Sequence, residues 1–326
     1  MLITRTPLRI SLGGGGTDLP SYYTRFGATV ISAAINKYIY IGINRTFTDD
    51  YFIKYAELER VATPADIRHP LIREAFLAHE LEPGVELVSL ADIPGGTGLG
   101  SSGAFTVGLL RAIYASRREH VGMGALAEEA CDIEIRRLGR TVGKQDQYIA
   151  AFGGLSRLDF ATDGTVTVSP LRVSTTTLHD LEEHLLLFFT GYSRSAESIL
   201  EDQQKRSDEG DPEMLENLHS IARIGARVKE ALEADDAAAF GSLLDEHWKL
   251  KRRRSAGMSS SNIDRWYEVG RSNGALGGKL VGAGAGGFLM FYATEPARLR
   301  AAMATEGLTE LRFAFDHDGS TVIIRA

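Results

Sequence analysis

The segment 92–104 holds the residues of this sequence that are best suited to bind a phosphate group. It reads Asp-Ile-Pro-Gly-Gly-Thr-Gly-Leu-Gly-Ser-Ser-Gly-Ala, and an apolar run typical of a helix follows at 105–114. Glycines let the backbone turn sharply towards a ligand, and a helix that begins there adds free N–H groups and the positive end of its dipole. The segment is not a Walker A loop, because Ser101 stands where that motif needs lysine. A nucleotide phosphate loop is favoured over a simple surface turn, since paired serines can offer a metal a hydroxyl.

A second glycine-rich loop, Gly-Gly-Gly-Gly-Thr-Asp at 13–18, follows an alternating strand pattern at 8–12. Four consecutive glycines are costly in backbone entropy, so either a ligand approaches the backbone there or the turn is very tight. The carboxylate of Asp18 could accept hydrogen bonds from a polyol in this open loop. An Asx turn before Leu19 and Pro20 is the structural alternative.

Two carboxylates are candidates for the chemistry that a phosphate loop would serve. Phosphoryl transfer needs a metal ion and a group that orients or deprotonates the attacking hydroxyl. Glu134 and Asp146 lie on either side of a break in the helical pattern at 139–143. The sequence leaves two structural alternatives open: a solvated helix face for Glu134, and a helix N-cap for Asp146.

A third glycine run, at 282–287, fits the G-x-G-x-x-G spelling of dinucleotide-binding folds. That fingerprint requires a helix next, but here the strand-like sequence Phe-Leu-Met-Phe-Tyr follows. The glycines are therefore interpreted as a tight turn beside the active-site cleft.

Composition limits the class of protein. The chain has 326 residues, which favours two domains, and its net charge of −7 disfavours non-specific nucleic-acid binding. The single cysteine, Cys131, excludes an internal disulfide and is interpreted as a core residue. Neither a signal peptide nor a membrane-spanning run is evident, so a cytoplasmic protein is expected.

The periodicity predicts a mixed first domain and a second domain that begins with a buried strand. The polar run Ser-Thr-Thr-Thr at 174–177 is the candidate boundary, which gives domains 1–176 and 177–326. Predicted strands are 8–12, 28–47, 51–55, 85–90, 155–159, 166–171, 185–189, 279–281, 288–292, 311–315 and 321–324. Predicted helices are 70–79, 105–114, 123–137 and 144–152, with further helices between 195 and 272 broken near 210–212 and at 257.

Three motifs in order resemble those of the galactokinase, homoserine kinase, mevalonate kinase and phosphomevalonate kinase (GHMP) superfamily. Segment 94–104 is similar to its phosphate loop, segments 6–10 and 17–18 to its first motif, and segment 279–288 to its third. The resemblance covers nearly the whole chain. It implies the α+β GHMP kinase fold, with an N-terminal mixed sheet and helices, a C-terminal ferredoxin-like domain, and ATP between them.

The resemblance also implies roles for individual residues. Asp146 is expected to be catalytic together with Arg9, and Ser102 and Glu134 to bind Mg²⁺. Gly15 and Gly16 stand where galactokinases carry Glu-His, which argues against galactose. The residues expected to bind ATP are those of the phosphate loop: Pro94, Gly95, Gly96, Thr97, Gly98, Leu99, Gly100, Ser101 and Ser102.

Within the superfamily the motifs are most similar to those of heptose 7-phosphate kinases. The marks are the loop at 13–20, Lys-Gln-Asp-Gln-Tyr at 144–148, the segment 190–196, and His-Trp followed by the basic run 249–254. This implies ATP-dependent phosphorylation of the anomeric hydroxyl to a 1,7-bisphosphate, in a monomer or homodimer. A kinase of fucose or another free hexose, and a catalytically silent sugar sensor, remain alternatives.

A sugar phosphate requires local cations in an acidic protein. Arg194 is the first candidate, because it lies in a predicted strand-to-helix loop between two serines. Lys249 or Lys251 is expected to help, although the run 249–254 could equally be a solvated face. The expected substrate-binding set is Gly15, Gly16, Thr17, Asp18, Arg194, Lys249, Lys251 and Gly284.

Overall fold

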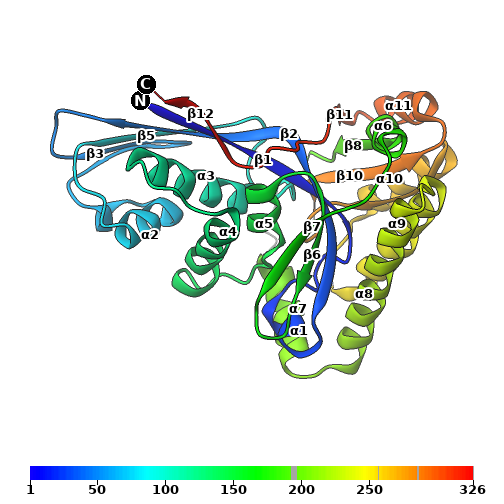
Figure 1. Cartoon of the computed structure of the whole chain (residues 1–326). Helices are drawn as coiled ribbons and strands as arrows, with labels where there is room; N and C mark the ends of the chain where they lie inside the picture. The colour runs from blue at the N-terminus through cyan, green and yellow to red at the C-terminus, as the bar shows by residue number, and fades with distance from the viewer. Residues whose placement is uncertain (192–196, 256, 285, 326) are drawn as a thin grey trace.

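The computed structural model describes residues 1–191, 197–255, 257–284 and 286–325, and two sheets organise them (Figure 1). The first sheet has eight strands in the order β12-β1-β2-β5-β3-β4, with β6 pairing with β2 and β7 with β6. The strands β3 and β5 pair in parallel and the other described pairs are antiparallel, so the sheet is mixed. Its strands are β1 (Leu2–Gly13), β2 (Ala28–Arg45), β3 (Tyr51–Lys54), β4 (Leu58–Val61), β5 (Val85–Ala91), β6 (Leu155–Phe160), β7 (Val166–Pro170) and β12 (Thr321–Arg325).

The long strand β2 joins the two halves of this sheet. Its first half pairs with β6 and its second half with β5, while β1 runs beside both halves. The side chains of Ile39, Ile41 and Ile43 are buried, whereas Tyr38 and Tyr40 on the other face are half-buried. The side chains alternate between the two faces as in a regular strand, and the segment predicted at 28–47 forms one continuous strand.

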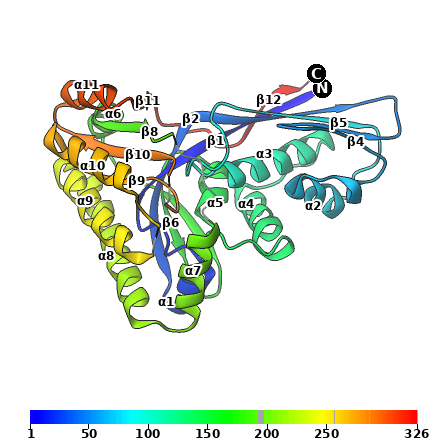
Figure 2. The same ribbon diagram turned by 180° about the vertical axis from the view of Figure 1, so that it is seen from behind.

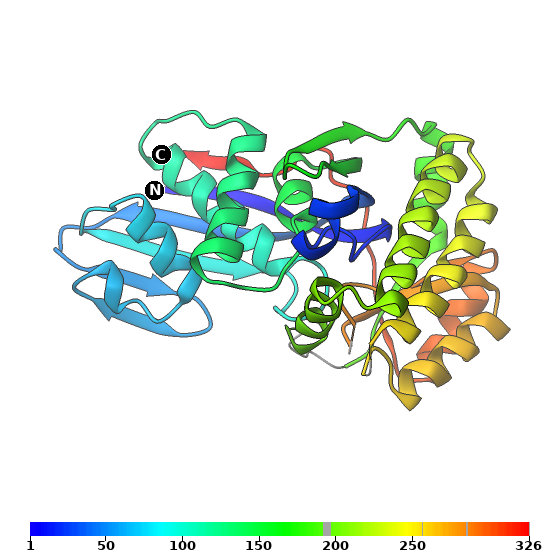
Figure 3. The ribbon, with the colours of Figure 1, turned by 90° about the horizontal axis from the view of Figure 1, so that it is seen from below.

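Helices cover one face of the first sheet, as the views from behind and below show (Figures 2 and 3). Helix α3 contacts both β1 and β2, and its small and apolar residues are buried along most of its length. Cys131 is buried in the same core, as the sequence predicted. The elements of this layer are α2 (Pro70–Ala78), α3 (Ser101–Ser116), α4 (Met123–Cys131), the π-helix η2 (Asp132–Arg137) and α5 (Gln145–Phe152); the short α1 (Pro20–Phe26) and η1 (Pro64–Asp66) lie in connections.

The second sheet has four antiparallel strands in the order β11-β8-β10-β9. In chain order this is 4-1-3-2, the strand order of a ferredoxin-like domain, which confirms that prediction. Its strands are β8 (Leu185–Phe189), β9 (Ala275–Leu280), β10 (Phe288–Ala293) and β11 (Thr309–Leu311). Its helices are α6 (Thr175–His184), α7 (Glu197–Asp208), α8 (Pro212–Glu233), α9 (Ala237–Arg254), α10 (Ser261–Ser272) and α11 (Pro296–Thr305).

Two features of the chain's course bear on the predicted domain boundary. The polar run at 174–177 begins helix α6, because Ser174 Oγ accepts a hydrogen bond of 3.1 Å from the Thr177 amide. The last strand leaves the second domain: β12 pairs with β1, which brings Leu2 opposite Arg325 and the two termini together (Figure 1). The last strand of the range 177–326 therefore belongs to the first sheet. Among the described residues, no helix is long and apolar enough to cross a membrane.

Candidate active site

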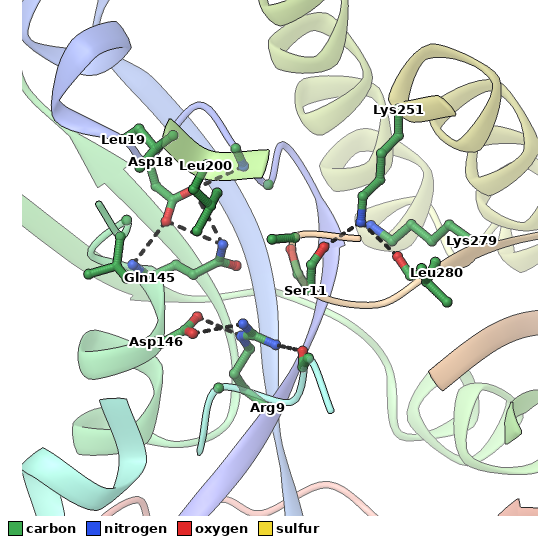
Figure 4. A pocket seen from close by; sticks show the side chains of 18 of the residues that line it. Arg9, Ser11, Asp18, Leu19, Gln145, Asp146, Leu200, Lys251, Lys279 and Leu280 are labelled. Carbon is green, nitrogen blue, oxygen red and sulfur yellow. Dashed lines mark hydrogen bonds and ion pairs between the residues drawn. The ribbon is translucent and has the colours of Figure 1, made fainter. Parts of the chain in front are cut away.

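A cavity of about 290 Å³ lies where the glycine-rich loops meet the second sheet (Figure 4). Three glycine-rich turns reach it: the loop after β1, the loop before α3, and the turn between β9 and β10. Asp146 at the start of α5 and basic residues of α9 complete the wall. The predicted tight turn after β9 lies beside this cavity, through Gly282 and Ala283.

The loop before α3 exposes backbone rather than side chains to the cavity. Gly96, Gly98 and Gly100 have φ values of +76°, +83° and +77°, a left-handed conformation that favours glycine. A Cβ atom on Gly98 would lie only 2.5 Å from the carbonyl oxygen of Val281. Helix α3 begins at Ser101, and no side chain caps its first N–H groups. This cradle fits the phosphates of ATP.

The loop's other residues hold its shape. Thr97 is buried, and its hydroxyl donates a hydrogen bond of 3.1 Å to the carbonyl of Pro94. Leu99 is buried, and its carbonyl accepts a hydrogen bond of 3.0 Å from the Arg9 amide. Gly96, Gly98, Gly100, Ser101 and Ser102 line the cavity, whereas Pro94, Gly95, Thr97 and Leu99 do not.

Arg9 and Asp146 form a bidentate ion pair at the floor of the cavity. Arg9 Nε donates to Asp146 Oδ1 at 2.7 Å, and Arg9 Nη2 donates to Oδ2 at 2.8 Å (Figure 4). Arg9 Nη1 donates to the carbonyl of Gly98 at 2.5 Å, so one guanidinium ties the carboxylate to the phosphate loop. Asp146 lies in the first turn of α5 without acting as its N-cap. Its carboxylate is therefore placed for chemistry beside the cradle.

Glu134 is buried on the π-helix η2, and one of its oxygens has no hydrogen bond. Oε1 accepts from Gln147 Nε2 at 2.8 Å, whereas Oε2 accepts no hydrogen bond from the described residues, although Arg140 Nη1 lies 3.6 Å away. Burial raises the pKa of Glu134, while hydrogen bonds from Gln147 and Ser102 lower it. A buried oxygen of this kind beside Ser102 fits a magnesium ligand, since Mg²⁺ needs few protein oxygens. The described residues contain no group of three or more His, Cys, Asp or Glu side chains that could hold a metal alone.

Asp18 faces the cavity from the first glycine loop. Its carboxylate accepts hydrogen bonds from the Gly16 amide at 3.0 Å and from the backbone and side chain of Gln145 at 3.2–3.3 Å. Burial, and then the charge of Asp146, raise the pKa of Asp18. Gly15, Gly16 and Asp18 line the cavity, but Thr17 is buried, and its hydroxyl donates to the carbonyl of Gly14.

The opposite wall carries four basic side chains, His247, Lys251 and Arg254 of α9 and Lys279 of β9, which we call the basic cluster. All four are buried and line the cavity. The α9 members are spaced by four and three residues, so they share one face of the helix. The sequence prediction included Lys251 alone, and this spacing within the run 247–254 is the signal that could have revealed the other two.

Two predicted substrate residues, Lys249 and Gly284, do not line the cavity. Lys249 is exposed and pairs with Asp245 at 2.7 Å on the outer face of α9, so of the two lysines that the sequence offered only Lys251 lines the cavity. Gly284 does not line the cavity, because it packs against Met258, whose sulfur would lie 2.6 Å from an added Cβ. Arg194 lies outside the described residues.

Comparison with known proteins identifies the family to which this chain belongs. The chain matches the models of the GHMP kinases N terminal domain at residues 69–154 and of the GHMP kinases C terminal domain at residues 228–308. It is also 32% identical to a curated family member over 97% of each chain. The chain therefore belongs to the GHMP kinase family and is an ATP-dependent kinase.

The relatives narrow the comparison further. The 32% identical protein is the D-glycero-alpha-D-manno-heptose 7-phosphate kinase of Campylobacter jejuni. A solved structure from Bacteroides thetaiotaomicron, described as a D-glycero-D-manno-heptose 1-phosphate kinase, has a TM-score of 0.81 at 26% identity over the full length of both chains. The L-fucokinase/L-fucose-1-P guanylyltransferase of Bacteroides fragilis is 25% identical over 90% of this chain and 34% of its own length.

Proposed function

We propose that this protein transfers the γ-phosphate of ATP to the anomeric hydroxyl of D-glycero-D-manno-heptose 7-phosphate, which gives the 1,7-bisphosphate and ADP. The observation that carries this proposal is the pairing of two features in one cavity. The ion pair of Arg9 and Asp146 stands beside a glycine cradle, and a basic wall faces the space above it. Such a wall suits an acceptor that is itself an anion, in a protein whose net charge is −7.

Each residue has a task in this reaction. Asp146 accepts the hydrogen bond of the attacking hydroxyl and takes its proton as the oxygen bonds to the γ-phosphorus and ADP leaves. Arg9 holds the Asp146 carboxylate in place through two hydrogen bonds, so the base does not rotate away. Asp18 accepts hydrogen bonds from other hydroxyls of the sugar and so fixes its orientation.

The donor side is formed by the loop before α3. Its backbone N–H groups and the start of the helix hold the ATP phosphates. Ser102 and Glu134 would hold Mg²⁺, which neutralises phosphate charge when it is bound. Oε2 of Glu134, which is buried and accepts no hydrogen bond from the described residues, supports this assignment.

A kinase of a free sugar is the alternative, and the similarity to the fucokinase of Bacteroides fragilis favours it. The descriptions of the two heptose kinases also differ in the position of the phosphate, 7 in one protein and 1 in the other. The acceptor and the site of transfer therefore both need a direct measurement.

The test is coupled ADP release with a panel of acceptors, followed by phosphorus NMR of the product. We expect heptose 7-phosphate to be preferred over free heptose, fucose and heptose 1-phosphate, with a new phosphorus signal coupled to the anomeric proton. Preference for a free hexose would refute the assignment. No ADP release with any acceptor, despite saturable sugar binding, would instead indicate a sensor.

A further inference from the structure

The basic cluster is organised by two elements that meet at the cavity. Residues 247, 251 and 254 lie on the inner face of α9, and Lys279 lies on the adjacent strand β9. The relative exposure of each of the four residues is 5% or less. Figure 4 shows Lys251 and Lys279 reaching the cavity from the side opposite Asp18 and Gln145, with Asp146 and Arg9 below them.

Among the described residues, no carboxylate forms an ion pair with Lys251 or Lys279. Lys251 Nζ donates to the carbonyls of Leu280, at 2.8 Å, and Gly282. Lys279 Nζ donates to the carbonyl of Leu12 at 3.1 Å and contacts His247 Nδ1 at 3.1 Å. The carboxylates that line the cavity are Asp18 and Asp146, and both are engaged elsewhere by Gln145 and Arg9. The two lysines therefore have no carboxylate partner among the described residues, although the charge of Asp18 acts on the neighbouring Arg254.

Such an arrangement is costly for the protein alone. A buried ammonium that lacks a counter-charge loses its hydration, and neighbouring cations repel it. Burial, and then the charges of Arg9 and Arg254, lower the pKa of Lys279 to about 7. Burial also lowers the pKa of Lys251, with Lys279 as the next cause. A bound dianion would reverse this cost, because it supplies the missing charge.

The lysines keep donors for such an anion. An ammonium has three N–H groups, and each lysine uses at most two in the contacts described. Arg254 has a different task. Its Nη1 donates to Gln203 Oε1 at 2.9 Å, and Gln203 Nε2 donates to the Gly16 carbonyl at 2.7 Å, so Arg254 positions the first glycine loop against α7.

We propose that Lys251 and Lys279 bind the phosphate group that the acceptor itself carries, and that they set the preference for a phosphorylated sugar. The proposal rests on the proposed function. The acceptor would lie above Asp146, with its hydroxyls towards Asp18 and its phosphate towards the two lysines. Two phosphate groups could bind to these lysines, the phosphate of the acceptor and the γ-phosphate of ATP, and the experiment below distinguishes them.

The test uses Lys251→Met and Lys279→Met, with Lys249→Met as the matched control. Lys249 lies on the same helix but is exposed and paired with Asp245. The quantity measured is the ratio of kcat/KM for heptose 7-phosphate to that for free heptose. Each buried-lysine variant should lower this ratio about 10- to 100-fold, the value of a hydrogen bond to a charged group, while the KM for ATP changes less than threefold. The control should keep the wild-type ratio.

The failure outcomes are distinct. If wild-type protein shows no preference for heptose 7-phosphate, the proposed function fails and the subsite fails with it. If wild-type protein prefers it and both variants keep that preference, the subsite alone is wrong. If the KM for ATP rises by as much as the preference for the sugar phosphate falls, the lysines bind the phosphate of the donor, and the proposal is also overturned. Methionine removes a buried charge and keeps an unbranched side chain that is one heavy atom shorter, and thermal unfolding checks that each variant is folded.

The pH dependence gives a second readout. The titratable and charged groups facing Lys279 are His247, Lys251 and Arg254 from α9 and Arg9 from β1, and burial beside these cations lowers the pKa of His247. With a pKa of about 7 in the free protein, Lys279 loses its charge as the pH rises through that value. Since kcat/KM reports the free enzyme, its value for the sugar phosphate should fall above about pH 7. Lys279→Arg should remove this fall, and a fall that persists unchanged contradicts the role of Lys279.

Discussion

Replacing Asp146 by asparagine removes one negative charge from the floor of the cavity and leaves the side-chain volume almost unchanged. The aspartate binds Arg9 through both oxygens, at 2.7 and 2.8 Å. An asparagine keeps one acceptor oxygen, but its amide places N–H groups against the guanidinium. We therefore expect one hydrogen bond to Arg9 to remain and the other to be lost, while Arg9 keeps its bond to the Gly98 carbonyl.

The structure separates the expected loss of activity from the loss of stability. An amide cannot accept the hydroxyl proton, so kcat should fall by about 10²- to 10⁴-fold, the usual contribution of a general base. This corresponds to about 3–5 kcal/mol of transition-state stabilisation. The lost hydrogen bond to a charged group costs at most about 1.5–3 kcal/mol of folding stability. The variant should thus be folded at 25 °C but nearly inactive.

Coupled ADP release at saturating ATP and acceptor measures kcat, and thermal unfolding measures stability. Asp159→Asn is the matched control, because Asp159 pairs with Arg157 at 2.7 Å with similar exposure (29% against 23%) and does not line the cavity. The control should keep its activity and lose no more stability than Asp146→Asn, since its partner Arg157 is more exposed than Arg9 (39% against 6%). If Asp146→Asn retains kcat within threefold of the wild-type value, Asp146 has no part in proton transfer, and the assignment of the base is wrong.

Three further predictions concern the metal, the acceptor and the donor loop. Glu134→Gln should keep the fold, because an amide oxygen still accepts a hydrogen bond from Gln147. It should raise the Mg²⁺ concentration needed for half-maximal activity by at least about tenfold. An unchanged magnesium titration would show that Glu134 is not a magnesium ligand. Asp18→Ala should raise the KM for the acceptor or lower kcat while the KM for ATP stays constant, and an equal loss of ATP affinity would favour a purely structural role. Gly98→Ala should weaken ATP binding and lower the stability of the fold by at least about 1–2 kcal/mol, since the φ of Gly98 is +83° and the added Cβ would meet Val281. Gly95→Ala should be tolerated, because the nearest atom to its added Cβ lies at 3.9 Å. Similar ATP affinities in both variants would contradict the role of this loop as a phosphate cradle.

The sequence by itself determined the features that depend on local backbone chemistry. Alternation along β2 is a property of consecutive residues, and so is the need for glycine before α3, where a left-handed backbone starts a helix. The strand after the third glycine run could likewise be predicted, because the residues at 288–292 have strand character and no helix signal. These conclusions required no knowledge of what lies across the cavity.

Only the tertiary structure decided which side chains meet. Arg9 and Asp146 are 137 residues apart and pair because β1 and α5 pack at one end of the first sheet. The basic run of α9 divides into an inner face with Lys251 and an outer face with Lys249, and the direction of each face depends on the packing of α9 against β9. In the sequence Lys279 has no feature that distinguishes it from other strand residues. The packing of β9 against α9 buries it beside Lys251 and Arg254. Burial and distance between remote segments are properties of the folded chain, which is why the meeting of Lys279 with the α9 residues could not be predicted from the order of the residues.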